Sequence, residues 1–263
     1  RDGQGVVQNY VKARKWFEKA AAQGEAEAQY NLGFIHHDGQ GVAQDYAEAR
    51  KWYEQAAAQG DAKAQYNLGV MYYHGQGVTK DYVKVREWLE KAAAQGLSAA
   101  QYNLGVMYRD GEGVAQDYAK ARKWFEKAAA QGLAAAQNNL GSMYHDSQGV
   151  AQDYAKAREW FEKAAVQGDV DAQYNLSLMY YRGRGGAQDS TKAREWFEKA
   201  AAQGDAKAQY NLGLMYEYGK GVAKDLLKAR EWYEQAAAQT ENAKNAKAVR
   251  RAQQALERMR GKR

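Results

Sequence analysis

The hydrophobic positions of the chain recur with a fixed period of 36 residues. Tryptophans mark this period, each followed by the next after 36 residues: Trp16, Trp52, Trp88, Trp124, Trp160, Trp196 and Trp232. A fixed period of this length is typical of one structural unit copied in tandem. We therefore expect a stack of repeats, in which each unit packs on its neighbours, rather than one or two globular domains.

The first half of the unit predicts a helix. In residues 61–96, Ala64, Leu68, Met71 and Tyr72 fall at i, i+4, i+7 and i+8, which is one face of a helix. The pattern ends at the glycine pair of the segment HGQG, which a helix tolerates poorly. We call this element helix A and expect a loop of about eight residues after it.

The second half of the unit predicts another helix, helix B. Val85, Trp88 and Leu89, with two alanines after them, form its apolar stripe. Asp81 is expected to cap its N-terminus, because a carboxylate can accept from the free amides of the first turn. The equivalent residues are Asn9, Asp45, Asp117, Asp153, Asp189 and Asp225. A glycine is expected to end each helix B: Gly24, Gly60, Gly96, Gly132, Gly168 and Gly204.

Small residues within helix A predict close helix packing. Gly69 costs about 1 kcal/mol in a helix relative to alanine, and we expect it to admit the alanine-rich face of a helix B. It recurs as Gly33, Gly105, Gly141 and Gly213, with Ser177 as the exception. The tryptophans are expected to fill the wider gap between hairpins, so Trp124→Ala should cost about 3–5 kcal/mol.

The pattern divides the chain into hairpins of one helix A and one helix B. We expect about fourteen helices and no sheet: a partial repeat at 1–24, hairpins at 25–60, 61–96, 97–132, 133–168, 169–204 and 205–239, and a basic C-terminal capping helix within 240–263. That last helix is predicted at about 241–260, with Val249, Leu256 and Met259 on its apolar face. Because the chain begins at Arg1 and its first repeat lacks a helix A, we expect that preceding residues have been removed.

Charge and composition limit the classes of function. The net charge of +6 comes from the tail, whose eight basic residues (Lys244, Lys247, Arg250, Arg251, Arg258, Arg260, Lys262, Arg263) exceed its two acidic ones (Glu241, Glu257), leaving 30 of each sign in residues 1–239. The chain lacks proline and cysteine, and it has no apolar stretch near the roughly 20 residues of a membrane span. We expect a soluble chain and favour a periplasmic or secreted location over a cytoplasmic one.

The repeated motifs AxAQYNLGxMY, GxGVxxDY and KAREWFEKAAxQG resemble those of the Sel-one-like repeat (SLR) family, which is related to tetratricopeptide repeats. The resemblance covers nearly the whole chain. It implies an all-α solenoid, a right-handed superhelix of antiparallel helix hairpins, and we expect a bacterial source. It also implies an adaptor without catalytic activity or cofactor, whose concave face, lined by helix A, holds a protein or peptide. The tetratricopeptide carboxylate clamp does not carry over, because its asparagine position holds residues such as Phe34 and Val70.

Three rows of helix A vary between otherwise similar repeats, and the resemblance places all three in the concave groove. They are Tyr30, Tyr66, Tyr102, Asn138, Tyr174 and Tyr210; then Phe34, Val70, Val106, Ser142, Leu178 and Leu214; and then His37, Tyr73, Arg109, His145, Tyr181 and Glu217. An exposed aromatic and apolar strip is typical of protein recognition. The alternative is that the tyrosines only cover the packing of the hairpins.

The hairpin at 133–168 departs from this pattern. Asn138 replaces a tyrosine, Ser142 replaces an apolar residue, and His145 stands where Tyr73 stands in another repeat. Together they predict a polar notch in an aromatic groove, where a polar group of a partner would find hydrogen bonds. Neutral drift in one copy is the alternative.

Other motifs favour structural roles. The segment HGQG follows a helix and lacks the lysine of a phosphate-binding loop. The four histidines show no metal-ligand spacing, and no residue is distinguished as a nucleophile or base, so we expect neither a metal site nor an enzyme. The asparagine row Asn31, Asn67, Asn103, Asn139, Asn175 and Asn211 could bind a partner's backbone or join neighbouring repeats. The remaining alternative is binding of nucleic acid or an anionic surface through the basic C-terminal helix, which would weaken steeply with salt.

Overall fold

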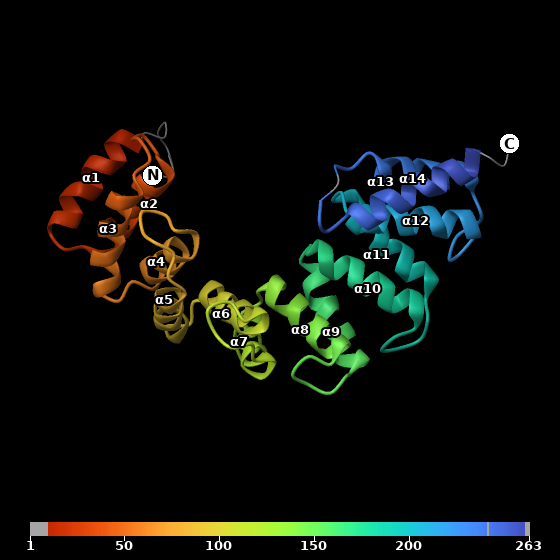
Figure 1. The fold of residues 1–263 in the computed structure, drawn as a ribbon, viewed down its shortest axis with the longest axis horizontal. Coiled ribbons are helices and arrows are strands. Elements are labelled where there is room, and N and C mark those ends of the chain that lie inside the picture. Colours follow the sequence, from red (N-terminus) through yellow and green to blue (C-terminus); the bar gives the residue numbers. More distant parts are fainter. Residues whose placement is uncertain (1–9, 241, 261–263) are drawn as a thin grey trace. The chain divides into compact units, whose positions relative to one another are not determined.

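The computed structural model describes residues 10–240 and 242–260. This part of the chain forms fourteen α-helices and no strand (Figure 1). They are α1 (Tyr10–Ala22), α2 (Ala26–Asp38), α3 (Tyr46–Ala58), α4 (Ala62–His74), α5 (Tyr82–Ala94), α6 (Ser98–Asp110), α7 (Tyr118–Ala130), α8 (Ala134–Asp146), α9 (Tyr154–Val166), α10 (Val170–Arg182), α11 (Ser190–Ala202), α12 (Ala206–Tyr218), α13 (Leu226–Ala237) and α14 (Ala246–Arg260). The expected all-helical repeat fold is confirmed.

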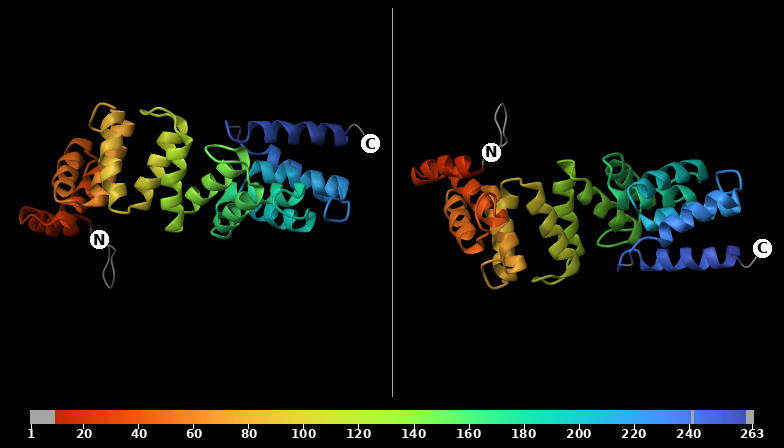
Figure 2. Two further views of the ribbon diagram at one scale, coloured as in Figure 1. Left: turned by 90° about the horizontal axis from the view of Figure 1, so that it is seen from below. Right: turned by 90° about the horizontal axis from the view of Figure 1, so that it is seen from above.

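The helices belong to two compact units, residues 1–131 and 132–263. Within each unit, every helix packs against the next helix along the chain (Figures 1 and 2). The even-numbered helices α2 to α12 are the predicted helices A, and the odd-numbered helices are the predicted helices B. Buried side chains between consecutive helices form a series of cores, as expected for a repeat protein.

The predicted helix ends are confirmed. Asp81 has extended backbone and its carboxylate accepts from the amides of Val83 and Lys84, and the other five capping aspartates behave alike. Asn9 lies outside the described residues. The glycines after each helix B have φ between 85° and 92°, a conformation that costs glycine little and other residues more. Each repeat therefore encodes its own start and stop signals.

The glycine within helix A makes room for an aromatic ring, and not for alanines as expected. A Cβ atom on Gly105 would lie 2.6 Å from the ring of Phe125, and one on Gly141 would lie 2.6 Å from the ring of Phe161. Both rings are buried. Leu89 takes the same place against Gly69. The predicted close approach of the two helices is therefore correct, but the predicted partner is wrong. The side chain that faces the glycine is the one directly after each tryptophan, and not an alanine.

The tryptophans themselves are only partly buried. Trp52 and Trp88 pack against the core of the preceding hairpin, as expected, but both keep some exposure, and Trp16 is 70% exposed. A lysine one turn later lies over several of the rings, for example Lys91 over Trp88 at 4.2 Å. Trp124 is likewise half-buried. The expected loss of 3–5 kcal/mol therefore belongs to the buried residue after each tryptophan, such as Phe125.

Pairs of glutamines connect the repeats, a feature that the sequence analysis missed. Gln65 on helix A is buried, and its amide donates to the carbonyl of Ala57 at 3.3 Å. Its carbonyl accepts from Gln95 Nε2 of the next turn at 2.9 Å. The same arrangement recurs at Gln29, Gln101, Gln173 and Gln209. These bonds satisfy amides that would otherwise be buried without partners.

The C-terminal helix begins later than expected. Residues 242–245 form a turn held by Asn242 and Asn245, and α14 starts at Ala246 rather than near 241. Val249 is buried against α12, while Leu256 and Met259 pack with Tyr233 of α13. The expected apolar face is therefore confirmed. Glu241, Lys262 and Arg263 lie outside the described residues. None of the described helices is long and apolar enough to cross a membrane.

Candidate partner-binding pockets

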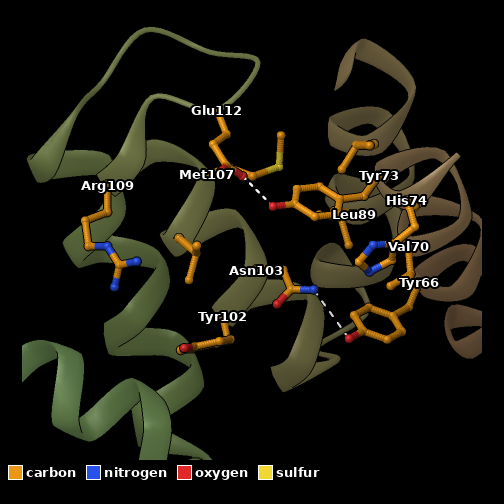
Figure 3. A pocket seen from close by; sticks show the side chains of 13 residues that line it. Tyr66, Val70, Tyr73, His74, Leu89, Tyr102, Asn103, Met107, Arg109 and Glu112 are labelled. Atoms are coloured by element: carbon orange, nitrogen blue, oxygen red, sulfur yellow. Dashed lines mark hydrogen bonds between the residues drawn. The ribbon is translucent and has the colours of Figure 1, made fainter. Parts of the chain in front are cut away.

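A cavity lined by predicted groove residues lies on the helix-A side of α4 and α6. This cavity, pocket 1, has a volume of about 350 Å³, and Leu89 of α5 and Gly69 contribute to its floor. Six predicted residues line it: Tyr66, Val70, Tyr73, Tyr102, Val106 and Arg109. Figure 3 shows Tyr66, Val70 and Tyr73 on one wall, and Tyr102 and Arg109 on the facing wall. Pocket 1 thus brings together residues from all three rows.

Hydrogen bonds join the two walls of pocket 1 (Figure 3). The Tyr73 hydroxyl donates to the Glu112 carboxylate at 2.8 Å, and Asn103 Nδ2 donates to the Tyr66 hydroxyl at 3.4 Å. The pKa of Tyr73 is raised, because Glu112 accepts its proton in a hydrogen bond and repels the phenolate form. The pocket is thus aromatic, with an acidic group at its rim.

A second cavity, pocket 2, occupies the equivalent place between α8 and α10, two repeats later. It has a volume of about 170 Å³, and Phe161 lies at its floor where pocket 1 has Leu89. Ser142, His145 and Leu178 are the predicted residues that line it. Arg182 and Arg184, which the sequence analysis did not select, also contribute.

The rim of pocket 2 has a different hydrogen-bond pattern. His145 Nδ1 lies 2.6 Å from Asp146 Oδ1, and Arg184 Nη1 lies 2.8 Å from His145 Nε2. Because a guanidinium can only donate, Nε2 must accept and the proton of the neutral ring sits on Nδ1, facing Asp146. Asn175 Nδ2 donates to Asn138 Oδ1 at 3.3 Å, just as Asn103 donates to Tyr66 in pocket 1.

Members of the third variable row therefore join neighbouring repeats as well as lining pockets 1 and 2. Half of its members contact the residue 39 positions later, at the centre of the next loop, and we call these contacts clasp pairs. Three are described: His37 with Gln76 at 3.2 Å, Tyr73 with Glu112 and His145 with Arg184. The loop residue varies together with its partner, a signal in the sequence that could have found Glu112 and Arg184.

The first row also packs within its hairpin. Tyr30, Tyr102, Tyr174 and Tyr210 are half-buried, with ring centroids 5.7–5.9 Å from the core ring of the next helix. Phe34, Tyr181 and Leu214 are half-buried as well, and the last two pack on the cores of their unit. These tyrosines therefore cover the packing of their hairpins, as the alternative states, and part of each ring stays exposed.

Glu217 does not occupy the exposed place expected for it. It is 8% exposed, accepts from the Tyr233 hydroxyl at 2.7 Å, and pairs with Arg258 of α14 at 2.6 Å. Burial and the Glu217 hydrogen bond raise the pKa of Tyr233. The capping helix covers this end of the row, so Glu217 is corrected from a groove residue to an anchor for α14.

The asparagine row is divided between two roles. Asn103 and Asn175 donate across to the preceding repeat. Asn31, Asn139 and Asn211 donate to the carbonyl four residues earlier in their own helix, at 2.7–2.8 Å. Both kinds of bond are intramolecular, which favours the structural interpretation of the row.

The repeat sequence is that of a known family. The Sel1 repeat profile matches seven successive segments, at residues 1–25, 26–61, 62–97, 98–133, 134–169, 170–205 and 206–240. The chain belongs to the Sel1 repeat family. Sel1 repeat proteins generally act as non-enzymatic scaffolds that mediate protein–protein interactions. The SLR resemblance of the sequence is thereby confirmed.

Two solved structures of this family resemble the chain closely. A protective antigen of uropathogenic Escherichia coli strains, which has an SLR fold, is 36% identical with a TM-score of 0.85. The match covers 94% of this chain and 56% of that protein, so the chain spans little more than half of the antigen's length. A Sel1 repeat protein from Oxalobacter formigenes is 37% identical with a TM-score of 0.77, over 84% of this chain and 91% of the other. No curated protein matches the chain.

Proposed function

We propose that the chain is a protein-binding scaffold that holds a peptide or protein segment against its helices A, with side chains of the partner in pockets 1 and 2. Pocket 1 carries this proposal. It is a concave site lined mainly by aromatic and aliphatic side chains with a few polar groups, which is the usual composition of a recognition pocket.

The rigidity of the pocket walls supports binding without a large rearrangement. Tyr102 packs against the Phe125 ring, and the Tyr66 hydroxyl accepts a hydrogen bond from the Asn103 amide. Both tyrosine rings are therefore oriented before a partner arrives. A pre-organised aromatic surface loses little side-chain entropy on binding.

A random-peptide display selection on the full chain tests the proposal. Selected peptides should bind with affinities that fall about tenfold or more in Tyr66→Ala and Tyr102→Ala, because each substitution removes an aromatic anchor. Val83→Ala is the matched control, since Val83 is 54% exposed on helix B of the same unit. Peptides that bind all three variants equally would show that recognition lies elsewhere.

The basic helix α14 offers a second candidate function, binding of nucleic acid or an anionic surface. Lys247 and Arg251 are exposed on α14, whereas Arg258 is paired with Glu217. Lys247→Gln with Arg251→Gln removes charge and leaves the buried face of α14 intact. Loss of binding to a duplex DNA fragment in this variant, with a steep salt dependence in the parent, would favour the second candidate.

We also propose a periplasmic or secreted location. The support is that a relative at 36% identity is a protective antigen. Fractionation of the source cells checks this, and recovery of the protein only with cytoplasmic markers would contradict it.

A further inference from the structure

Pockets 1 and 2 lie at equivalent positions of the repeat but differ in charge. Tyr73 and Glu112 of pocket 1 correspond, 72 residues later, to His145 and Arg184 of pocket 2. Arg182 also lines pocket 2, and its counterpart, Asp110, does not line pocket 1. Pocket 1 is lined by one arginine and one glutamate, whereas pocket 2 is lined by two arginines and one aspartate. Tyr66 and Val70 are likewise replaced by Asn138 and Ser142, which remove aromatic and aliphatic surface.

Arg184 is fixed in place before any ligand binds. Its guanidinium lies 5.1 Å from the centre of the Tyr154 ring and donates to His145 Nε2 at 2.8 Å. These contacts use one face and one nitrogen of the group, and its other N–H groups remain available. A guanidinium held in this way is pre-organised for a further acceptor.

Other donors of pocket 2 are unused. Within residues 10–240 and 242–260, the Arg182 guanidinium and the Ser142 hydroxyl have no hydrogen-bond partner. Asp146 is the acidic side chain lining the pocket, and it already faces the protonated Nδ1 of His145. Two guanidinium groups against one carboxylate leave the pocket with a net positive charge.

We propose that pocket 2 binds the carboxylate of a glutamate or aspartate side chain of the protein partner. Arginine matches a carboxylate with paired N–H donors, which makes such bonds stronger than those between neutral groups. Phe161 and Leu178 provide an apolar surface for the methylene groups of the ligand, and the volume of about 170 Å³ suits one side chain. A glutamine of the same shape offers no charge to the guanidinium groups and binds more weakly.

The inference rests on the proposed function, because the carboxylate belongs to the same bound segment. It can still be tested alone with a small probe. The amide signals of the ¹⁵N-labelled full chain are followed by NMR during titration with N-acetyl-glutamate N-methylamide at low ionic strength. The probe should shift the amides of Ser142, Asn175 and Leu178. Their counterparts Val70, Asn103 and Val106 in pocket 1 should not move.

Two variants and a second probe complete the experiment. Arg182→Gln with Arg184→Gln should weaken binding of the glutamate probe by about tenfold or more. Lys192→Gln with Lys199→Gln removes the same two positive charges from exposed sites of the same unit and should leave binding unchanged. N-acetyl-glutamine N-methylamide should shift the pocket 2 amides far less than the glutamate probe does.

Equal shifts with both probes, shifts that survive the double arginine substitution, or absence of any shift at pocket 2 would each overturn the inference. These results leave the peptide selection on pocket 1 unaffected. Conversely, selected peptides that ignore Tyr66 and Tyr102 would refute the proposed function even if pocket 2 bound the glutamate probe. The two failures are therefore distinguishable.

Discussion

Pockets 1 and 2 occupy the same position of the repeat and differ in the side chains of their rims and walls. Both have a floor residue facing a glycine of helix A, Leu89 on Gly69 and Phe161 on Gly141. Both have an asparagine that donates across the walls. The rim pair changes from Tyr73 with Glu112 to His145 with Arg184. The comparison teaches that the buried residues of the repeat keep the position of the pocket, while the variable rows set the polarity and charge around it.

The largest expected effect concerns the floor. Phe161→Ala should destabilise the chain by about 3–5 kcal/mol and Leu89→Ala by about 2–5 kcal/mol, because each removes a buried side chain that fills the space above a glycine. Urea denaturation of the full chain measures both. Val166→Ala, at a position 72% exposed on the same helix as Phe161, should change little. If Phe161→Ala unfolded at the same urea concentration as Val166→Ala, the floors would not be the common structural element.

Exchanging the walls should change recognition more than stability. Asn138→Tyr with Ser142→Val gives pocket 2 the wall residues of pocket 1. A tyrosine hydroxyl can accept from Asn175 as Tyr66 accepts from Asn103, so stability should hold or rise. Affinity for a peptide selected on the parent chain should fall tenfold or more, as measured by calorimetric titration. Unchanged affinity would mean that the polar notch arose by neutral drift.

A backbone difference between the two hairpins predicts a smaller effect. Ser147 ends α8 with φ of 61°, where the pocket 1 hairpin has Gly75. A side chain disfavours this left-handed conformation, although Ser147 Oγ recovers a hydrogen bond to the carbonyl of Val150 at 3.1 Å. Ser147→Gly should therefore raise stability by about 0.5–1 kcal/mol. Thermal denaturation checks this, and a lower melting temperature would show that the hydroxyl bond outweighs the strain.

The smallest expected effect concerns the clasp pair of pocket 1. Tyr73→Phe removes the bond to Glu112 and should cost about 0.5 kcal/mol at neutral pH, since the pair is partly solvated. The raised folded pKa of Tyr73 makes this contribution complete below about pH 10, the ordinary tyrosine value. It is lost as the pH rises through the folded pKa. Denaturation at pH 7 and at high pH should show the difference from the parent shrinking; a constant difference would contradict the role of the proton.

The sequence predicted the fold because each repeat states its helix boundaries locally. Aspartate caps such as Asp81 and turn glycines such as Gly96 act within a few residues, so their roles can be predicted without knowledge of the tertiary structure. Which of two adjacent large side chains is buried could not be predicted in this way. Trp88 and Leu89 are adjacent on the helix, and only the position of the facing Gly69 determines which one is enclosed.

The candidate site was predictable in its rows and not in its pairs. Helical spacing puts Tyr66, Val70 and Tyr73 on one wall, and pocket 1 contains all three. The contribution of Glu112 and Arg184 comes from loops, whose path depends on how one hairpin rests on the previous one. Glu217 shows the same limit, because only the packing of α14 reveals that its row is covered there.

The clasp pairs restrict how copies of the repeat can be exchanged during evolution. Gain or loss of one 36-residue unit would keep the helices in phase but would change which residues face each other in the clasp pairs. Loss of residues 98–133 would present Gln148 to Tyr73, which can still donate to it. Loss of residues 134–169 would place Arg184 opposite Arg109, whereas it now bonds to His145. Two positive charges would then face each other. Each repeat is therefore suited to its present neighbours by the residues of its clasp pairs, although the buried cores of the repeats are alike.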